Sequence, residues 1–376
     1  RLTHTDPTSP DVPSCAGVRC RALAQVPIFR SDGHSSSARC EAMRGGKMAV
    51  ASVKGMAVLT AAAVLATACS STGGDARTAA RVGASQHDGD PEEAPSSPAS
   101  AEAGWDGVAR ALGRAGKLSA DGKVYRVSFP RSDLKVTSYG VSIKAGLALG
   151  GYTAFTRYPD GTVLMMGDLV VTEPELQKVT DVLQRQGIEQ TALHKHLLAH
   201  QPEVWWAHVH ATGRDAAAIA RSIRAALDVT ATPAAPAPST SPPALPIDTA
   251  AIDQAMGAKG TNDGGIYKFT FKRNRPVTEH GRVIPPGMGI TTAISFQPTG
   301  GGKAAINGDF ALTADEIQRV IQALRHGGIS IVEIHNHALH DEPRLFYMHF
   351  WANDDAIELA RTLHKAVTEQ AVTPAA

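Results

Sequence analysis

The chain has 376 residues, 43% of them hydrophobic, which is typical of a globular protein with room for two domains. Lys and Arg number 37 and Asp and Glu 36, giving a formal net charge of +1. No basic run is interleaved with aromatic residues. This charge pattern excludes a strongly basic binding surface, so we expect no nucleic-acid partner.

The first part of the chain does not look like a domain. Residues 1–47 show no hydrophobic periodicity, and we interpret them as a non-native upstream extension of the reading frame. Residues 48–69 follow the plan of a secretory signal peptide, in which Lys54 precedes the apolar run GMAVLTAAAVLATA and small residues precede Cys69. The run is shorter than the roughly 20 residues that a transmembrane helix needs.

The end of this segment, Ala66–Cys69 (ATAC), resembles the bacterial lipobox, whose cysteine becomes a lipidated N-terminus. A plain signal peptide cut nearby is the alternative. The remaining cysteines, Cys15, Cys20 and Cys40, lie upstream, so the mature protein would hold no disulfide and no thiolate ligand. We therefore predict an exported protein, anchored in the membrane of the bacterial cell envelope by a lipid on Cys69.

The rest of the chain is an internal duplication. Residues 70–103 are rich in Ser, Ala, Gly, Pro and acidic residues and are predicted to form a disordered tether. A Pro/Ala linker, residues 229–246, separates a first repeat domain, residues 104–228, from a second, residues 247–372. The two domains align at an offset of 141 positions, for example at Gly167-Asp168 and Gly308-Asp309.

Each copy predicts the same order of elements. An opening helix (105–112; 252–256) is followed by an alternating strand (124–129; 266–271) and, in the first copy, strands near 141–143, 148–157 and 162–169. The patterns Thr172-x-x-Glu175 and Thr313-x-x-Glu316 predict capped helices, and two strands and a closing helix (215–227; 354–367) come next. We predict an α+β fold of two homologous tandem domains, each a mainly antiparallel sheet with helices packed on one face.

Histidines concentrate on the two strands between these helices. In the first copy they are His194, His196, His208 and His210, and the second copy has His335, His337 and His349, with Trp351 in the fourth place. Residues i and i+2 of a strand share a face. A hairpin about Pro202 would set His196 opposite His208 and His194 opposite His210; Pro343 would do the same in the second copy.

Paired imidazoles at this spacing predict a divalent transition-metal site, with zinc as the first candidate, although imidazole also suits copper and nickel. Four imidazoles in the first copy would make a closed site. Three imidazoles in the second copy would leave an open position, as in catalytic zinc, and Glu333 or Glu342 would act as a general base for hydrolysis. The alternative is that the histidines simply line a polar groove.

Other residues near the histidines have two interpretations each. Asp168 and Asp309 are either turn acids near a helix start or carboxylates that orient ligand histidines. Trp206 and Trp351 could wall a ligand pocket, and Arg344 could clamp an anionic group or lie on the surface. A rival function is therefore a non-catalytic envelope module that recognises a cell-wall polymer or small ligand.

The second copy, from Gly308-Asp309 through GISIVEIHNH (328–337) to EPRLFYMHFW (342–351), resembles the LppY/LpqO-type lipoprotein family of bacteria. The first copy is similar through Gly167-Asp168 and TALHKHLL (191–198). The resemblance covers nearly all of residues 104–370. It implies an envelope lipoprotein and no particular chemistry. The first copy departs from the pattern after His196, where HQPE (200–203) replaces DEPR (341–344).

Overall fold

The computed structural model describes residues 104–235 and 243–375. All of them belong to one compact unit, His87–Ala376. Cys69, the predicted signal peptide and the predicted tether all lie outside the described residues. Within the described ranges, no helix has the length and hydropathy needed to cross a membrane.

The first repeat has one main sheet, whose described strands are all antiparallel and follow the order β1-β2-β5-β6-β9-β7. Its strands are β1 (Lys117–Leu118), β2 (Tyr125–Pro130), β5 (Gly150–Arg157), β6 (Val163–Thr172), β7 (Glu189–His194) and β9 (Val204–Gly213). A small sheet in the order β4-β3-β8 joins β3 (Thr137–Ser138), β4 (Val141–Ser142) and β8 (His200–Gln201). The helices are α2 (Asp106–Leu112), α3 (Ala145–Ala148), α4 (Glu173–Arg185) and α5 (Ala216–Leu227).

The second repeat has the same plan, with a main sheet in the order β10-β11-β14-β15-β18-β16 and β19 paired to β11. Its strands are β10 (Thr261–Asp263), β11 (Ile266–Arg273), β14 (Thr292–Gly300), β15 (Lys303–Leu312), β16 (Ser330–His335), β18 (Phe346–Asp355) and β19 (Val372–Pro374). A small sheet joins β12 (Val277–Glu279), β13 (Arg282–Ile284) and β17 (Asp341–Glu342). The helices are α6 (Thr249–Met256), α7 (Ile317–His326), α8 (Ala356–Thr368) and the short 3₁₀ helix η1 (Pro286–Met288).

Helix caps fix where the long helices start. Thr172 donates its backbone N–H to the Glu175 carboxylate at 2.8 Å, so the predicted capping box opens α4. In the second repeat the Glu316 carboxylate accepts from the Thr313 N–H at 2.9 Å, but a turn intervenes and α7 begins at Ile317. The expected strand at 148–157 begins two residues late, at Gly150, because α3 occupies the preceding residues.

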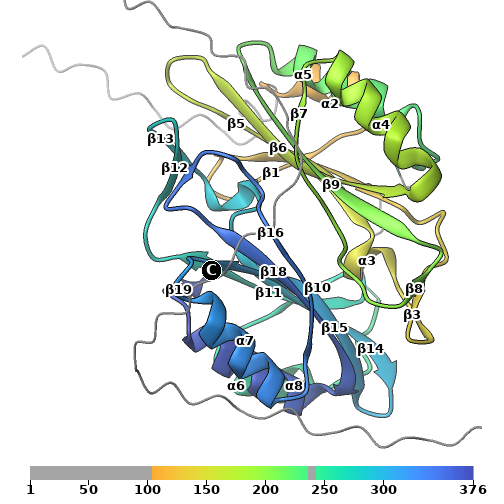
Figure 1. Cartoon of the computed structure of the whole chain (residues 1–376), viewed down its shortest axis with the longest axis vertical. Coiled ribbons are helices and arrows are strands. Elements are labelled where there is room, and N and C mark those ends of the chain that lie inside the picture. The colour runs from red at the N-terminus through yellow and green to blue at the C-terminus, as the bar shows by residue number, and fades with distance from the viewer. Residues whose placement is uncertain (1–103, 236–242, 376) are drawn as a thin grey trace, which may run out of the picture. The chain divides into compact units, whose positions relative to one another are not determined.

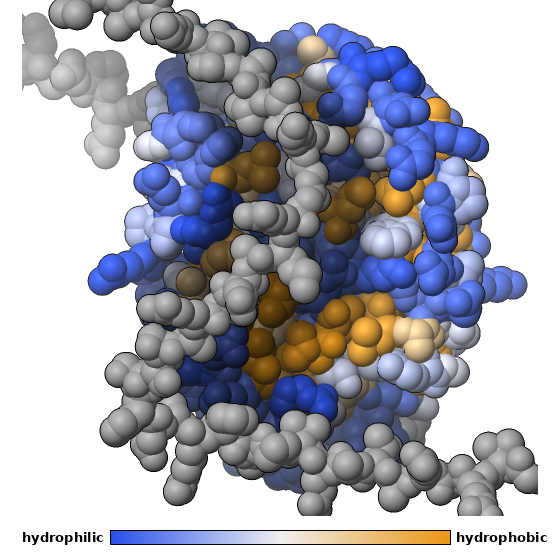
Figure 2. All heavy atoms as spheres, in the orientation of Figure 1, coloured by the Kyte–Doolittle hydropathy of each residue, from blue (hydrophilic) through white to orange (hydrophobic). Residues whose placement is uncertain are grey.

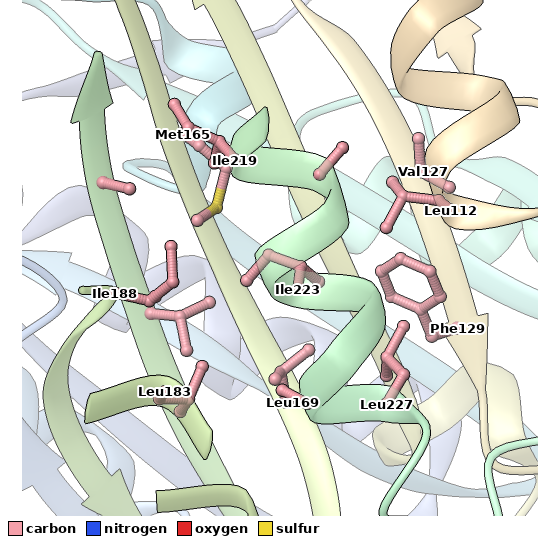
Figure 3. Packing of buried hydrophobic residues seen from close by; sticks show 14 of the residues in the cluster. Leu112, Val127, Phe129, Met165, Leu169, Leu183, Ile188, Ile219, Ile223 and Leu227 are labelled. Atoms are coloured by element: carbon pink, nitrogen blue, oxygen red, sulfur yellow. The ribbon is translucent and has the colours of Figure 1, made fainter. Parts of the chain in front are cut away.

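Helices cover one face of each sheet, as the sequence predicted. Figure 1 shows α2, α4 and α5 together on one side of the first sheet, and α6, α7 and α8 together on one side of the second. Apolar side chains of each sheet pack against its helices. In the first repeat, Ile219, Ile223 and Leu227 of α5 lie over Met165 and Leu169 of β6 (Figure 3). Each repeat therefore has its own helix-covered core.

The opposite faces of the sheets are buried too, because two further apolar clusters combine residues of both repeats. One joins Leu164 and Met166 of β6 to Ala311 and Tyr347 of the second repeat. The other joins Trp206 to Trp351 and neighbouring residues. The long strands are thus buried on both sides, and their polar residues on the second face are enclosed between the repeats. On the face shown in Figure 2, hydrophilic residues predominate, and a band of hydrophobic residues crosses the lower half of the view.

Candidate metal centre

The histidines of the two repeats meet in a single cluster between the sheets. Three pairs of rings, each pair joining one repeat to the other, have centroids 3.8 Å apart. The pairs are His194 with His335, His196 with His349, and His208 with His337. We call these six residues the histidine cluster. The sequence predicted one site in each repeat, whereas the structure forms one site from both.

The cluster has an approximate twofold symmetry that follows from the duplication. The rings of His194 and His208 are 4.6 Å apart, and their counterparts His335 and His349 are 4.8 Å apart. Across the repeats, His194 and His349 are separated by 5.2 Å, and His208 and His335 by 5.3 Å. The two similar repeats therefore place similar side chains around one axis, with His194 and His335 stacked beside it.

Strand pairing explains why these side chains point into the space between the sheets. In β9, Ala207 and Val209 belong to the helix-covered core, so His208 lies on the other face. On the neighbouring strand β6, Asp168 lies directly opposite His208 and on the same face of the sheet. The second repeat reproduces this row with His349 opposite Asp309.

The H-x-H residues lie at the ends of the edge strands. His194 is the last residue of β7, and His196 lies two residues beyond it. The His196 ring stacks on Trp206 with centroids 4.4 Å apart and planes at 11°. Its counterpart, His337, stacks on Tyr347 with planes at 5°. These aromatic rings hold the loop histidines over the cluster.

Backbone carbonyls fix the tautomers of three histidines. A carbonyl only accepts, so the ring Nδ1 that contacts it must donate, and Nε2 is left with a free lone pair. These contacts are His208 Nδ1 to Gly167 O at 3.2 Å, His337 Nδ1 to Gly289 O at 2.8 Å and His349 Nδ1 to Gly308 O at 2.7 Å. Such outer contacts are usual for histidines that bind metal through Nε2.

Burial favours the neutral form of five of the six imidazoles. It lowers the pKa of His194, His196, His208, His335 and His349, and the charges of neighbouring histidines lower most of them further. For His349 the nearby Asp309 carboxylate opposes this effect, yet the net shift of the pKa is still downward. Neutral imidazole is the form that binds metal.

Two aspartates border the histidines. Asp168 Oδ2 lies 3.4 Å from His196 Nε2, and Asp309 Oδ2 lies 3.1 Å from His337 Nε2. Burial and the charge of Asp309 raise the pKa of Asp168. Burial also opposes ionisation of Asp309, but its interactions with His349 and His337 outweigh burial and hold its pKa below the ordinary value. The predicted proximity of these carboxylates to the histidines is observed, although both lie inside long strands rather than in turns.

Several buried polar atoms of the site have no hydrogen-bond partner. Among the described residues these include Asp168 Oδ1, Asp309 Oδ1, His194 Nδ1, His335 Nδ1, His337 Nε2 and His349 Nε2. A buried polar atom without a partner costs about 1–3 kcal/mol. A cation among these atoms would remove much of that cost, so the donor set fits a metal ion.

Three groups of side chains bring one ligand atom each within 4.8 Å of the others. They are His194, His208 and His335; His194, His196 and His349; and Asp309, His335 and His337. Two of these groups draw on both repeats. The set predicted for the second repeat alone, His335, His337 and His349, is not among the groups of the described residues.

The predicted hairpin register is wrong in both repeats. His194 pairs with Trp206 and His210 pairs with Glu189, whereas the symmetry about Pro202 had placed His194 opposite His210. In the second repeat His335 pairs with Tyr347 instead of Trp351. The strands are not joined by a tight turn, because the intervening residues leave the main sheet to form β8 or β17 in the small sheets. A bulge in β7 and another in β16 shift the register further.

His210 does not join the cluster as predicted. Its Nε2 lies 2.6 Å from the Glu279 carboxylate and its Nδ1 lies 3.4 Å from that of Glu189. Trp351, at the matching position, is 4% exposed and packs in the apolar cluster with Trp206, which is 1% exposed. Both tryptophans are therefore buried, so the prediction that they wall a ligand pocket does not fit; Trp206 supports His196 instead.

Neither of the two residues predicted as a general base is placed to act on a metal-bound water. Glu333 is opposite His349 in the sheet, but its carboxylate accepts the backbone N–H of Lys195 at 2.7 Å and so links the two repeats. Glu342 is exposed on β17, and Arg344 donates to the Ala338 carbonyl at 2.9 Å. The blander interpretation of Arg344, a surface residue beside a turn, fits this contact.

Sequence reasoning missed the residues that join the repeats. Thr191 donates its hydroxyl to the His337 carbonyl at 2.6 Å, and the Asn336 side chain donates to the Thr191 carbonyl at 3.0 Å. Asn307 donates to the His196 carbonyl at 2.6 Å. One signal was available, because the strand VWWAHVHA (204–211) carries a tryptophan on each face, which indicates that both faces are covered.

Comparison with known families places this site in context. The sequence model of the family described as Domain of Unknown Function (DUF1259) matches residues 106–229 and again residues 250–369. The chain belongs to this family. Both family domains are needed for the histidine cluster, since each supplies three of its rings. No curated protein matches the chain.

Two solved structures show a weak likeness. The trimeric bacterial microcompartment shell protein PduB is 12% identical, and the match covers 66% of this chain and 88% of that one at a TM-score of 0.17. EtuB from Clostridium kluyveri is 10% identical, with coverage of 69% and 94% and a TM-score of 0.17. At this level the likeness says nothing about function.

Proposed function

We propose that the histidine cluster binds a divalent transition metal, with zinc as the first candidate. One observation carries the proposal: three groups of side chains, two of imidazoles from both repeats and one of Asp309 with two histidines, each bring their ligand atoms within 4.8 Å of one another. Imidazole nitrogen and carboxylate oxygen are normal zinc ligands. The buried atoms without partners support the same conclusion, because a cation would satisfy them.

We further propose that the protein holds this metal in a closed centre rather than using it for hydrolysis in the second repeat. His194, His208, His337 and His349 are between 0 and 6% exposed. A catalytic zinc keeps one position open for water or substrate, whereas a closed set of protein ligands is typical of structural and storage sites. Two of the three groups also combine histidines of both repeats, which argues against a separate catalytic centre in one of them.

We propose as well that the protein is an exported lipoprotein of the bacterial envelope, anchored through Cys69. The basic start, the apolar run and the lipobox-like Ala66–Cys69 support this location. Labelling cells with a fatty-acid analogue tests it. We expect the parent to be labelled and Cys69→Ser to lose the label; equal labelling of both would reject the anchor.

The metal proposal is tested by elemental analysis of the purified full chain after mild purification and after incubation with zinc. We expect bound zinc in the parent, and its loss in a His194→Ala, His335→Ala variant. His326→Ala is the matched control, because His326 is exposed at the end of α7. If the parent takes up no stoichiometric zinc, copper or nickel, the proposal fails.

One observation supports the rival function, which is recognition of a small envelope ligand. A cavity of about 660 Å³ between the repeats, away from the histidines, is lined in part by Trp105, Tyr158 and Pro285. Aromatic rings with a nearby cation, here Arg157, suit sugars and other flat ligands. Ligand-detected NMR with soluble cell-wall fragments tests this rival, and a signal lost in Trp105→Leu would support it.

A further inference from the structure

We infer that the histidine cluster holds two transition-metal ions, each in a ligand set completed by a histidine of the other repeat. The first set is His194, His196 and Asp168 of the first repeat with His349 of the second. The second set is His335, His337 and Asp309 of the second repeat with His208 of the first. The inference rests on the metal binding proposed above and adds the number and division of the ions.

Distances between ring nitrogens support the division. In a tetrahedral site with bonds of about 2.0–2.1 Å, two ligand atoms lie roughly 3.3–3.4 Å apart. Two close pairs occur in the cluster: the Nε2 atoms of His194 and His196 are 2.9 Å apart, and those of His208 and His335 are 3.3 Å apart. The pairs share no histidine, and each falls within a different one of the two sets.

Ring orientation separates the sets from the competing one-ion arrangement. A nitrogen lone pair lies in the plane of its ring, so parallel stacked rings direct their lone pairs side by side, whereas tilted rings can converge. The competing group, His194, His208 and His335, consists of rings with interplanar angles of 3°, 12° and 14°. These three rings are poorly oriented to meet at one ion.

Each proposed set has one near-parallel pair, His194 with His349 at 5° or His208 with His335 at 14°, and adds a loop histidine that is tilted to both. In the first set, His196 is tilted by 38° to His194 and by 35° to His349. In the second, His337 is tilted by 40° to His335 and by 34° to His208. The loop histidine of each repeat thus turns toward the strand histidine of the other, and the two sets repeat the geometry almost unchanged.

Unpartnered atoms complete the case. A single ion among His194, His208 and His335 would leave His337 Nε2, His349 Nε2 and both aspartate Oδ1 atoms buried without partners. Two ions reach all of these side chains, because each set includes one aspartate and three histidines. Of the two arrangements, the two-ion one includes all six histidines and both aspartates and preserves the symmetry of the duplication.

The test is native mass spectrometry of the full chain loaded with zinc, with His196→Gln, His337→Gln and their double variant. We expect two ions in the parent, one in each single variant and none in the double variant. His210→Gln, outside both sets, should keep two. Circular dichroism checks that each variant folds. Asp168→Asn and Asp309→Asn hardly change side-chain volume and serve as a second pair of variants. Each is expected to lower the affinity for one of the two ions on the order of 10–100-fold.

The outcomes separate this inference from the proposed function. One ion in the parent that survives both His196→Gln and His337→Gln overturns the two-ion inference and leaves metal binding intact. No ion in the parent overturns the proposed function itself. Titration with Co²⁺ gives an independent readout, because the absorbance of bound Co²⁺ should rise up to two equivalents; saturation at one equivalent would contradict the two-ion inference.

Discussion

His194 and His335, equivalent residues of the two repeats, stack face to face with ring centroids 3.8 Å apart and planes at 12°. This contact lies beside the approximate twofold axis, so each repeat meets its own copy there. Neither repeat alone brings together the histidines of the cluster. The duplication therefore did not give two copies of one site. It created a single cluster to which both repeats contribute.

The structure predicts different fates for two histidines that the sequence treats alike. His194→Gln should weaken metal binding on the order of 100-fold or more, since loss even of an outer contact costs 10–100-fold. His210→Gln should leave metal binding unchanged, because His210 contacts Glu279 and Glu189 instead. Zinc affinity measured by competition with a chelating dye checks both. Equal losses in the two variants would contradict the placement of His210.

The metal-free protein should lose stability steeply as pH falls below about 6.5. Burial first, then neighbouring charges, lowers the pKa of His194, His196 and His208 in the folded state, so the unfolded chain binds protons first. Stability is therefore full above the ordinary histidine pKa and declines with acid, by about 1 kcal/mol per buried histidine between pH 6.5 and 5.5. Urea unfolding of the chelator-treated protein at pH 6.5 and 5.5 measures this change in the free energy of unfolding. A flat profile would show that these imidazoles are not buried in solution.

Much of the fold follows from local sequence signals. The capping box at Thr172, the Asp215 cap of α5 and the alternating pattern of β11 each reflect a local rule, and all appear in the structure. The 141-residue offset revealed the duplication because similar residues return at a fixed distance. Local physics thus predicted two α+β domains with helices on one face of each sheet.

The site was less predictable because its geometry depends on long-range contacts. The symmetry about Pro202 predicts a tight hairpin, but β8 pairs with β3, a partner remote in sequence, and this contact opens the turn. The sequence also identified four histidines in the first repeat and three in the second, without showing that His196 would face His349. A pattern within one copy carries no information on which surface covers it.

The glycine before each aspartate should resist substitution. A Cβ on Gly308 would lie 2.1 Å from the Ala293 carbonyl oxygen, so Gly308→Ala must push β14 away from β15. We expect a loss of about 1–3 kcal/mol, the usual cost of overpacking. Gly150→Ala is the control, because its nearest contact, at 3.6 Å, is ordinary. Thermal unfolding followed by circular dichroism compares them, and equal melting temperatures would refute the close approach.

A buried ion pair should anchor the start of α7 to the sheet. Arg273 and Glu316 are 9% and 4% exposed and lie 2.6 Å apart, and Glu316 also accepts the backbone N–H of Ala371 at 2.8 Å. Glu316→Gln leaves the Arg273 charge buried without a counter-ion, so we expect a loss of about 3–5 kcal/mol at pH 7.

The pH dependence of this loss follows from the Glu316 carboxyl. Burial raises its pKa, but hydrogen bonds from Arg273 and two backbone amides outweigh burial and leave the pKa below the ordinary value. The stabilisation is therefore complete above the unfolded pKa of about 4.3 and disappears as pH falls through the lower folded value. Urea unfolding of Glu316→Gln and parent should converge at acid pH. The control, Glu369→Gln in the exposed pair with Arg319, should cost at most about 1 kcal/mol, and a similar cost for both variants would contradict the buried anchor.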